Sequence, residues 1–314
     1  MFNKFSLRIF AAAWAMLGVA ANAQAPTNAL AGQQLLQPGV LIARETAQVV
    51  FMSPDSAIEQ VSIVSGKTSW ISQEGAMPIA LHQNQLLVLR DGAERGKLAY
   101  ALLNVKDGQL LSRAFLSVPM PARALIDERL GESFKIETAG EGLRWSYRRE
   151  LVPGALMDEA QDGGEKQAEL SKLEGALAID WTRGSLSPAS NSSLKAAVVP
   201  PAEIGQASPD KPRNFRSVGG DYRLQSERLK DGRYRWLITD LSGTRLGEVV
   251  SDYSYRPFDV VGKLLVYVKP IKVTVAKGKG QLEMPTLTAI NLRDGKVAWQ
   301  REIRDTRYYG PFPS

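Results

Sequence analysis

The fold is decided by one short stretch near the end of the chain, Ala289–Trp299, which reads AINLRDGKVAW. An apolar run, an Asp-Gly turn and a second strand ending in Trp follow one another in it. Gln60–Trp70 has the same layout, and in both stretches a turn glycine precedes the Trp by four residues. Glycine readily adopts the positive φ that a tight hairpin turn requires. Both stretches therefore predict β-hairpins.

Three weaker copies of this hairpin keep the turn but lose the Trp: Leu103–Gly108, Ala178–Gly184 and Ile238–Gly243. The residues that we interpret as the structural repeat are Gly66, Trp70, Gly108, Asp180, Gly184, Asp240, Gly243, Asn291, Gly295 and Trp299. Successive turn glycines lie 42, 76, 59 and 52 residues apart. The shortest interval matches one β-propeller blade of about 40–45 residues, and the longer ones have room for an insertion or a degenerate blade. The repeats predict an all-β fold, a β-propeller of about six irregular blades.

Two further hairpins strengthen the all-β prediction, Phe134–Tyr147 and Tyr222–Ile238. Aromatic and aliphatic residues occupy every second position in them, and mostly polar or charged residues occupy the positions between. Alternation with a period of two predicts strands that have one buried face.

Two segments interrupt the pattern of hairpins, residues 153–174 and 185–217. The first is rich in Gly, Glu, Asp and Lys, and it predicts either a short helix through Leu170 and Leu173 or a loop. The second holds many Ser and Ala residues and five Pro, a composition that disfavours strands. We expect the second segment to be a flexible or exposed loop between two blades, with a boundary between two domains as the alternative.

Residues 1–23 have the pattern of a secretory signal peptide. Two basic residues precede the apolar stretch Ile9–Ala21, and a small-residue cleavage site ends at Ala23. The 13 residues of that stretch are fewer than the roughly 20 that a membrane-spanning helix needs, although an uncleaved anchor is the alternative. We therefore expect a mature chain of residues 24–314 without a transmembrane segment, located in the periplasm or secreted.

The composition excludes several kinds of chemistry. The 314 residues include no Cys and a single His. Without Cys there is no disulfide, thiolate nucleophile, thiolate zinc site or iron–sulfur cluster. We expect the single His, His82, to be a surface or loop imidazole. The formal net charge of +6 includes two basic residues of the signal, so the mature chain is only mildly basic, and we expect no nucleic-acid partner.

Acidic residues leave an enzymatic alternative open, because glycoside hydrolysis uses two carboxyl groups about 5–10 Å apart. The chain has two acidic clusters, formed by Asp127, Glu128 and Glu132 and by Asp158, Glu159, Asp162 and Glu165. Neither cluster belongs to a recognisable catalytic motif. We expect no catalytic residue, no metal and no cofactor.

The hairpin pattern A-x-D-x-x-x-G-x-x-x-W resembles the repeat of quinoprotein-like (PQQ-repeat) β-propellers. Ala289–Trp299 fits this pattern with Asn291 at the Asp position, and Ala178–Gly184 keeps Ala, Asp and Gly but has no Trp. Gln60–Trp70 keeps only the Gly and the Trp. The resemblance implies that Asp and Gly shape the turn and that the Trp docks across neighbouring blades. We interpret Trp70 and Trp299 in this way rather than as residues that stack on a ligand.

The resemblance implies two classes of function. The family includes quinone-dependent alcohol dehydrogenases and non-enzymatic periplasmic scaffolds that bind another envelope protein. The dehydrogenases are longer and carry a vicinal disulfide against the cofactor, whereas this chain has no Cys. We therefore expect a non-catalytic scaffold for protein–protein interaction in the bacterial cell envelope. The sequence does not predict its oligomeric state. The alternative is a small-ligand-binding protein, or a glycan- or quinone-dependent enzyme, that uses the central funnel.

The last residues of the chain are the candidate contact with an envelope protein. Tyr and Arg are frequent at binding hot spots, and Pro residues prevent this segment from continuing a strand. The candidate partner contacts are Arg307, Tyr308, Tyr309 and Phe312. The alternative is that these aromatic residues pack on the last blade.

Overall fold

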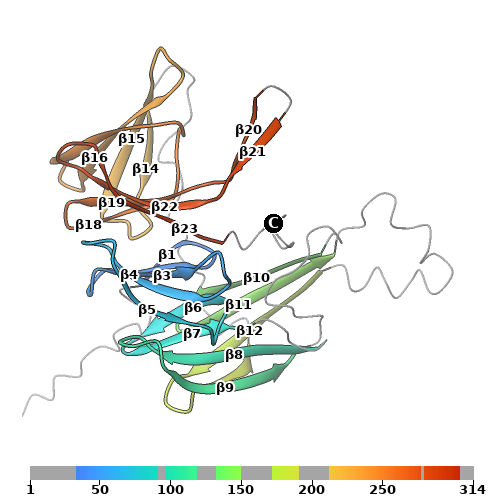
Figure 1. The fold of residues 1–314 in the computed structure, drawn as a ribbon. Helices are drawn as coiled ribbons and strands as arrows, with labels where there is room; N and C mark the ends of the chain where they lie inside the picture. The colour runs from blue at the N-terminus through green and yellow to red at the C-terminus, as the bar shows by residue number, and fades with distance from the viewer. Residues whose placement is uncertain are drawn as a thin grey trace, which may run out of the picture.

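The structure is a computed structural model that describes residues 33–90, 96–118, 132–149, 172–190, 212–276 and 279–304. The regular secondary structure in these ranges consists of β-strands alone, which confirms the all-β prediction. The strands form five antiparallel sheets of four or five strands and one separate hairpin (Figure 1). No helix in the described ranges is long and apolar enough to cross a membrane.

Each sheet is a meander whose strands pair in chain order, and we name the sheets A to E. Sheet A comprises β1 (Gln33–Gln37), β2 (Val40–Ala43), β3 (Gln48–Met52), β4 (Ile58–Ser62) and β5 (Thr68–Ser72). Sheet B comprises β6 (Met77–His82), β7 (Gln85–Leu89), β8 (Lys97–Asn104) and β9 (Leu110–Ser117). Sheet C comprises β10 (Glu132–Ala139), β11 (Gly142–Arg149), β12 (Lys172–Asp180) and β13 (Ser185–Ala189).

Sheets D and E complete the set. Sheet D comprises β14 (Arg213–Arg216), β15 (Tyr222–Arg228), β16 (Tyr234–Asp240) and β17 (Arg245–Ser251). Sheet E comprises β18 (Phe258–Val261), β19 (Leu264–Lys269), β22 (Thr286–Asn291) and β23 (Val297–Glu302). The separate hairpin, β20 (Lys272–Ala276) and β21 (Lys279–Glu283), is inserted between β19 and β22.

Sheets A, B and E have both faces buried, because each packs between two neighbours. On β7, Leu86 belongs to the core shared with sheet A, whereas the next residue, Leu87, belongs to the core shared with sheet C. On β19, Leu265 and Val266 divide in the same way between sheets D and A. Strands buried on both faces have nearly continuous apolar sequences, as these two strands do.

Sheets C and D have only one buried face. On β15 and β16 of sheet D, Leu224 and Trp236 are buried against sheet E, whereas Arg223 and Arg235 point away and are exposed. On β11 of sheet C, Trp145 is buried against sheet B. These are the two sheets whose hairpins alternate with a period of two, so the alternation marks the sheets that have a neighbour on one side only.

The shared cores place the sheets in the order D, E, A, B, C. Figure 1 shows sheet D at the top of the view, sheets B and C at the bottom, and sheets A and E between them. Among the described residues, no core cluster joins sheets C and D, so the five sheets form an open arc. A propeller of six blades is not confirmed. In the described ranges, the long interval between Gly108 and Gly184 contains β9 of sheet B and the first three strands of sheet C, and no additional sheet.

The ends of the two segments that the sequence predicted to be insertions belong to strands. Ser185–Ala189 and Arg213–Arg216 are strands, although both lie within residues 185–217. Pro188 is tolerated because β13 is an edge strand, where a missing N–H removes no bond to a further strand. Leu173 lies in β12 and not in a helix. The rest of both segments lies outside the described residues.

Candidate functional site

Trp299 joins the last sheet of the chain to the first. It lies on β23 of sheet E, and its indole N–H donates a hydrogen bond of 2.7 Å to the carbonyl oxygen of Ile63 in sheet A. Its ring lies against Gly66, where a Cβ atom would stand 2.5 Å from Trp299 Cγ. A side chain at this turn position would therefore displace the indole.

Trp70 makes the equivalent contact between sheets A and B, and we call such a contact between neighbouring sheets a joint. From β5 of sheet A, its indole N–H donates a bond of 2.7 Å to the carbonyl oxygen of Val105 in sheet B. The ring lies against Gly108, where a Cβ atom would stand 2.5 Å from Trp70 Cε3. Both tryptophans therefore dock between neighbouring sheets, and neither ring is free to stack on a ligand.

The polar residue and the glycine of each repeat shape its turn. The amide of Gly295 donates to the carbonyl oxygen of Asn291 at 2.8 Å, with φ of +68° at the glycine. The Asn291 side chain accepts from the Arg293 amide, and Asp180 and Asp240 accept from amides in their own turns. These side chains are occupied with turn geometry and form no ligand site.

At the joint between sheets B and C, the tryptophan comes from the turn of the later sheet, C, and not from the last strand of the earlier sheet, B. Ser112 occupies the position on β9 that corresponds to Trp70, and Gly184 packs against it. Trp181, from the turn of sheet C, instead reaches back to His82 at the end of β6, with ring centroids 5.1 Å apart. His82 is the last residue of β6 and is half-buried against Trp181.

The arc ends where the next joint is missing. Sheet D packs on sheet E so closely that a Cβ atom at Gly247 would lie 2.0 Å from the carbonyl oxygen of Leu292. In contrast, the turn glycine of sheet D, Gly243, has nothing within 4 Å of its Cβ position. Four of the five possible joints around the arc are therefore formed by the described residues, and the joint between sheets C and D is not.

A partly buried ion cluster, which the sequence did not predict, connects sheets A, D and E. Arg44, which follows β2, forms a two-pronged salt bridge with Asp259 on β18 and a further one with Asp221. The Asp259 side chain is fully buried, and burial raises its pKa, while the hydrogen bonds from Arg44 act in the opposite direction. For Arg44, burial alone would lower the pKa, but hydrogen bonds and charges from both carboxylates outweigh it, so the pKa is raised. The cluster is a structural joint, because its groups satisfy one another.

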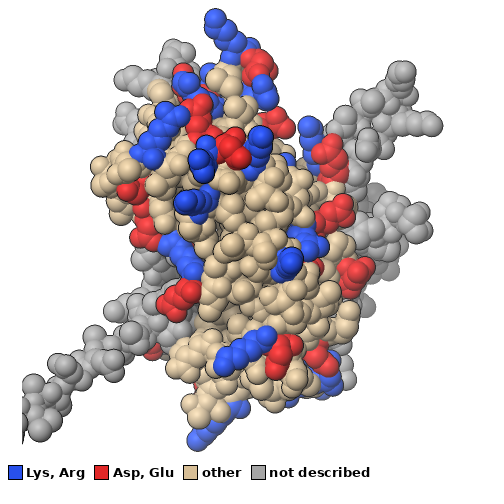
Figure 2. Space-filling view, turned by 60° about the vertical axis from the view of Figure 1, so that its left-hand side comes forward, with Lys and Arg blue, Asp and Glu red and all other residues tan. Residues whose placement is uncertain are grey.

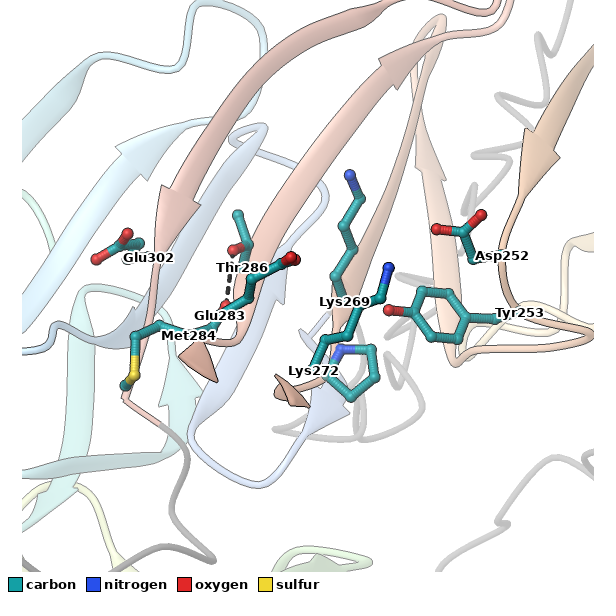
Figure 3. Close-up of a pocket in the computed structure, with 9 residues that line it drawn as sticks. Asp252, Tyr253, Lys269, Lys272, Glu283, Met284, Thr286 and Glu302 are labelled. Carbon is teal, nitrogen blue, oxygen red and sulfur yellow. Dashed lines mark hydrogen bonds between the residues drawn. The ribbon is translucent and has the colours of Figure 1, made fainter. Parts of the chain in front are cut away.

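A polar pocket of about 380 Å³ lies where the hairpin meets sheets D and E (Figure 3). The pocket is lined by Asp252, Tyr253, Lys269, Pro270, Lys272, Glu283, Met284, Thr286 and Glu302. Figure 3 shows Lys269, Lys272 and Tyr253 on one side and Glu302 on the other. Burial raises the pKa of the Tyr253 hydroxyl. Among the described residues, the five charged side chains of this pocket form no ion pair with one another.

The end sheets present two solvent-facing surfaces. The sheet D outer face is formed by Arg216, Arg223, Gln225, Glu227, Arg235, Leu237, Thr239, Arg245, Glu248 and Val250. The sheet C outer face is formed by Lys135, Glu137, Arg144, Ser146, Glu174, Ala178 and Ser187. Figure 2 shows charged side chains gathered over the upper part of the molecule, where Figure 1 places sheet D, above a largely uncharged middle.

Several residues singled out in the sequence lie outside the described residues. They are the candidate contacts Arg307, Tyr308, Tyr309 and Phe312, and nearly all of the two acidic clusters. Glu132 begins β10, and its side chain is not described. The described residues contain no group of His, Asp and Glu side chains that could hold a metal ion.

Comparisons with known proteins give no family for this chain. No family model matches it, and no curated protein matches it. Among solved structures, an uncharacterised protein of Listeria monocytogenes is 10% identical, with a TM-score of 0.28, over 88% of this chain and 94% of the other. TolB of Acinetobacter baumannii is 14% identical, with a TM-score of 0.25, over 81% of this chain and 51% of TolB. A europium-containing methanol dehydrogenase is 13% identical, with a TM-score of 0.22, over 88% and 70%. TM-scores this low carry no argument about fold or function.

Proposed function

We propose that the protein is an exported, non-catalytic scaffold that binds another protein of the bacterial cell envelope, with its sheets in an irregular, propeller-like arrangement. The observation that carries the proposal is the open end of the arc. Sheet D shares a buried core with sheet E, yet its other face is covered by no described sheet. An exposed sheet face with charged and apolar side chains offers a surface on which another protein can bind.

Export is supported by the sequence of residues 1–23, with its basic start, its apolar stretch and its small-residue cleavage site. These residues lie outside the described ranges. Residues Arg307–Phe312 remain a second candidate contact, on the composition of the segment alone.

The test is to crosslink the tagged protein in its native cells and to identify the attached proteins by mass spectrometry. We expect one reproducible envelope partner in a near-stoichiometric amount. The matched control lacks residues 1–23 and should capture no envelope partner. Failure to capture any partner with folded, abundant protein would contradict the scaffold proposal.

A small-ligand-binding function is the second candidate, and the pocket beside the hairpin favours it. Two lysines and three carboxylates with no ion pair among them would suit a ligand that carries both charges. Binding should stabilise the protein by about 2.7 kcal/mol at a hundredfold excess over the dissociation constant. Thermal unfolding with amino acids, oligosaccharides and a quinone cofactor tests this, with Lys269→Ala/Lys272→Ala as the control. An unchanged melting temperature in every case would remove this candidate.

A further inference from the structure

The sheet D outer face carries a lateral row of arginines. The strand register sets Arg216 of β14 directly opposite Arg223 of β15, and Arg223 opposite Thr239 of β16. Thr239 in turn pairs with Arg245 on β17. The row therefore runs across all four strands of the sheet, and three of its four members are arginines.

Two of the four arginines on this face form an ion pair with a described residue, and two do not. Arg235 pairs with Glu227, and Arg245 pairs with Glu248 at 2.9 Å. These pairs use both carboxylates of the face. Arg216 and Arg223 have no ion pair with any described residue, although like charges directly opposite each other on a sheet destabilise it. The two arginines thus lack an acidic counterpart at a position where the sheet itself gains nothing from them.

The rest of the face has the composition of a protein-binding surface. All four cations are arginines and none is a lysine, and binding interfaces are enriched in Arg and depleted in Lys. Leu237 lies near the middle of the face, and Val250 beside it is 46% exposed. Arginine is among the residue types enriched at binding hot spots, and the two apolar side chains add uncharged contact area between the arginines.

We infer that the sheet D outer face binds an acidic, extended segment of a partner protein, whose carboxylates pair with Arg216 and Arg223. An apolar side chain of the same segment would contact Leu237 and Val250. A guanidinium group binds a carboxylate through two parallel hydrogen bonds, which gives such a pair both strength and direction. The inference rests on the proposed scaffold function and names the chemistry of its partner.

A protein segment fits this face better than a polyanion such as a nucleic acid or an array of lipid headgroups. Glu227 and Glu248 lie on the same face and would repel a dense array of negative charges. A segment with a few well-placed carboxylates avoids both glutamates and meets the two arginines that have no ion pair.

The experiment places a photo-crosslinking amino acid at Leu237 in the full-length protein, expressed in its native cells. We expect an adduct with one envelope protein, and the crosslinked peptide of that protein should contain at least two acidic residues. Arg216→Glu/Arg223→Glu should lower the adduct yield about tenfold or more, because it replaces attraction by repulsion. This variant keeps two like charges opposite each other, so its melting temperature should be close to that of the unmodified protein. The control, Lys135→Glu on the sheet C outer face, where the residue directly opposite is the neutral Ser146, should leave the yield unchanged.

Charge exchange completes the test. Changing the two acidic residues of the crosslinked segment to Arg should restore the adduct with Arg216→Glu/Arg223→Glu. The inference is overturned by an undiminished yield, by a contact peptide without acidic residues, by an adduct with a second copy of this chain, or by an adduct with lipid or nucleic acid. It is also overturned if whole-protein crosslinking captures a partner but Leu237 gives no adduct. If neither approach captures a partner, the scaffold function fails as well.

Discussion

Replacing Gly66 by Ala is predicted to destabilise the protein by about 3–5 kcal/mol, mostly through its contact with Trp299. The new Cβ atom would lie 2.5 Å from Cγ and 2.8 Å from Cβ of the indole side chain, so the ring must move. Overpacking of this kind costs about 1–3 kcal/mol, and loss of the hydrogen bond to Ile63 adds about 1 kcal/mol. Ala at the positive φ of +67° costs about 1 kcal/mol more.

The control for this prediction is Gly232→Ala. Gly232 also has a positive φ, +88°, but nothing lies within 4 Å of its Cβ position. This variant should lose only about 1 kcal/mol of the free energy of unfolding, which is the cost of placing Ala at a positive φ. Urea unfolding of both variants, followed by circular dichroism, measures the difference. In a double-mutant cycle, Gly66→Ala and Trp299→Ala should couple by at least about 1 kcal/mol. Equal destabilisation by the two glycine variants, or additivity in the cycle, would refute the assigned role of the tryptophan joint.

Three further predictions concern charged and titratable groups. Burial raises the pKa of the Tyr267 hydroxyl to about 12 from 10.0, so as the pH rises the hydroxyl loses its proton in the unfolded chain before it does so in the folded protein. The free energy of unfolding should therefore fall by about 2–3 kcal/mol between about pH 10 and 12. Tyr267→Phe should remove that part of the decline in urea titrations at alkaline pH, and an unchanged decline would contradict the assignment. Arg216→Glu alone should raise stability by about 0.2–1 kcal/mol, because it turns a like-charge cross-strand pair into an opposite-charge pair, while it weakens partner binding. Loss of stability in urea unfolding would count against the pairing of Arg216 with Arg223. Asp259→Ala should destabilise by about 3 kcal/mol, since it removes the buried partner of Arg44 and leaves the guanidinium only its exposed pair with Asp221, and a thermal shift of less than a degree would show that the salt bridge with Asp259 contributes little.

The hairpins and their tryptophans were predictable because their signals are local. A turn glycine four residues before a Trp, as at Gly295 and Trp299, specifies both the turn and the position of the ring on the outer strand. The alternation in Tyr222–Ile238 likewise predicted strands with one buried face. The sequence could not show that such sheets end an arc, because this depends on which sheets share a core.

Contacts between residues far apart in the chain had no recognisable signal. Arg44 and Asp259 are 215 residues apart, and only the presence of an Asp in the apolar run of β18 hinted at a buried partner. The ring contact between His82 and Trp181 depends on the packing of sheet B against sheet C. The arginine row was visible as separate arginines at alternating positions, but the register that sets Arg216 opposite Arg223 comes only from the folded sheet.

The most direct test of the scaffold account uses the absence of Cys from the chain, which makes an introduced Cys the only thiol. Gln225→Cys places that thiol on the sheet D outer face, and Ala101→Cys places one in the core as a protected control. The account predicts that a maleimide labels Gln225→Cys rapidly in the purified protein and several-fold more slowly in native cells, where the partner covers the face. Slow labelling of the purified protein would contradict the open arc, and equally rapid labelling in cells would contradict a partner on this face.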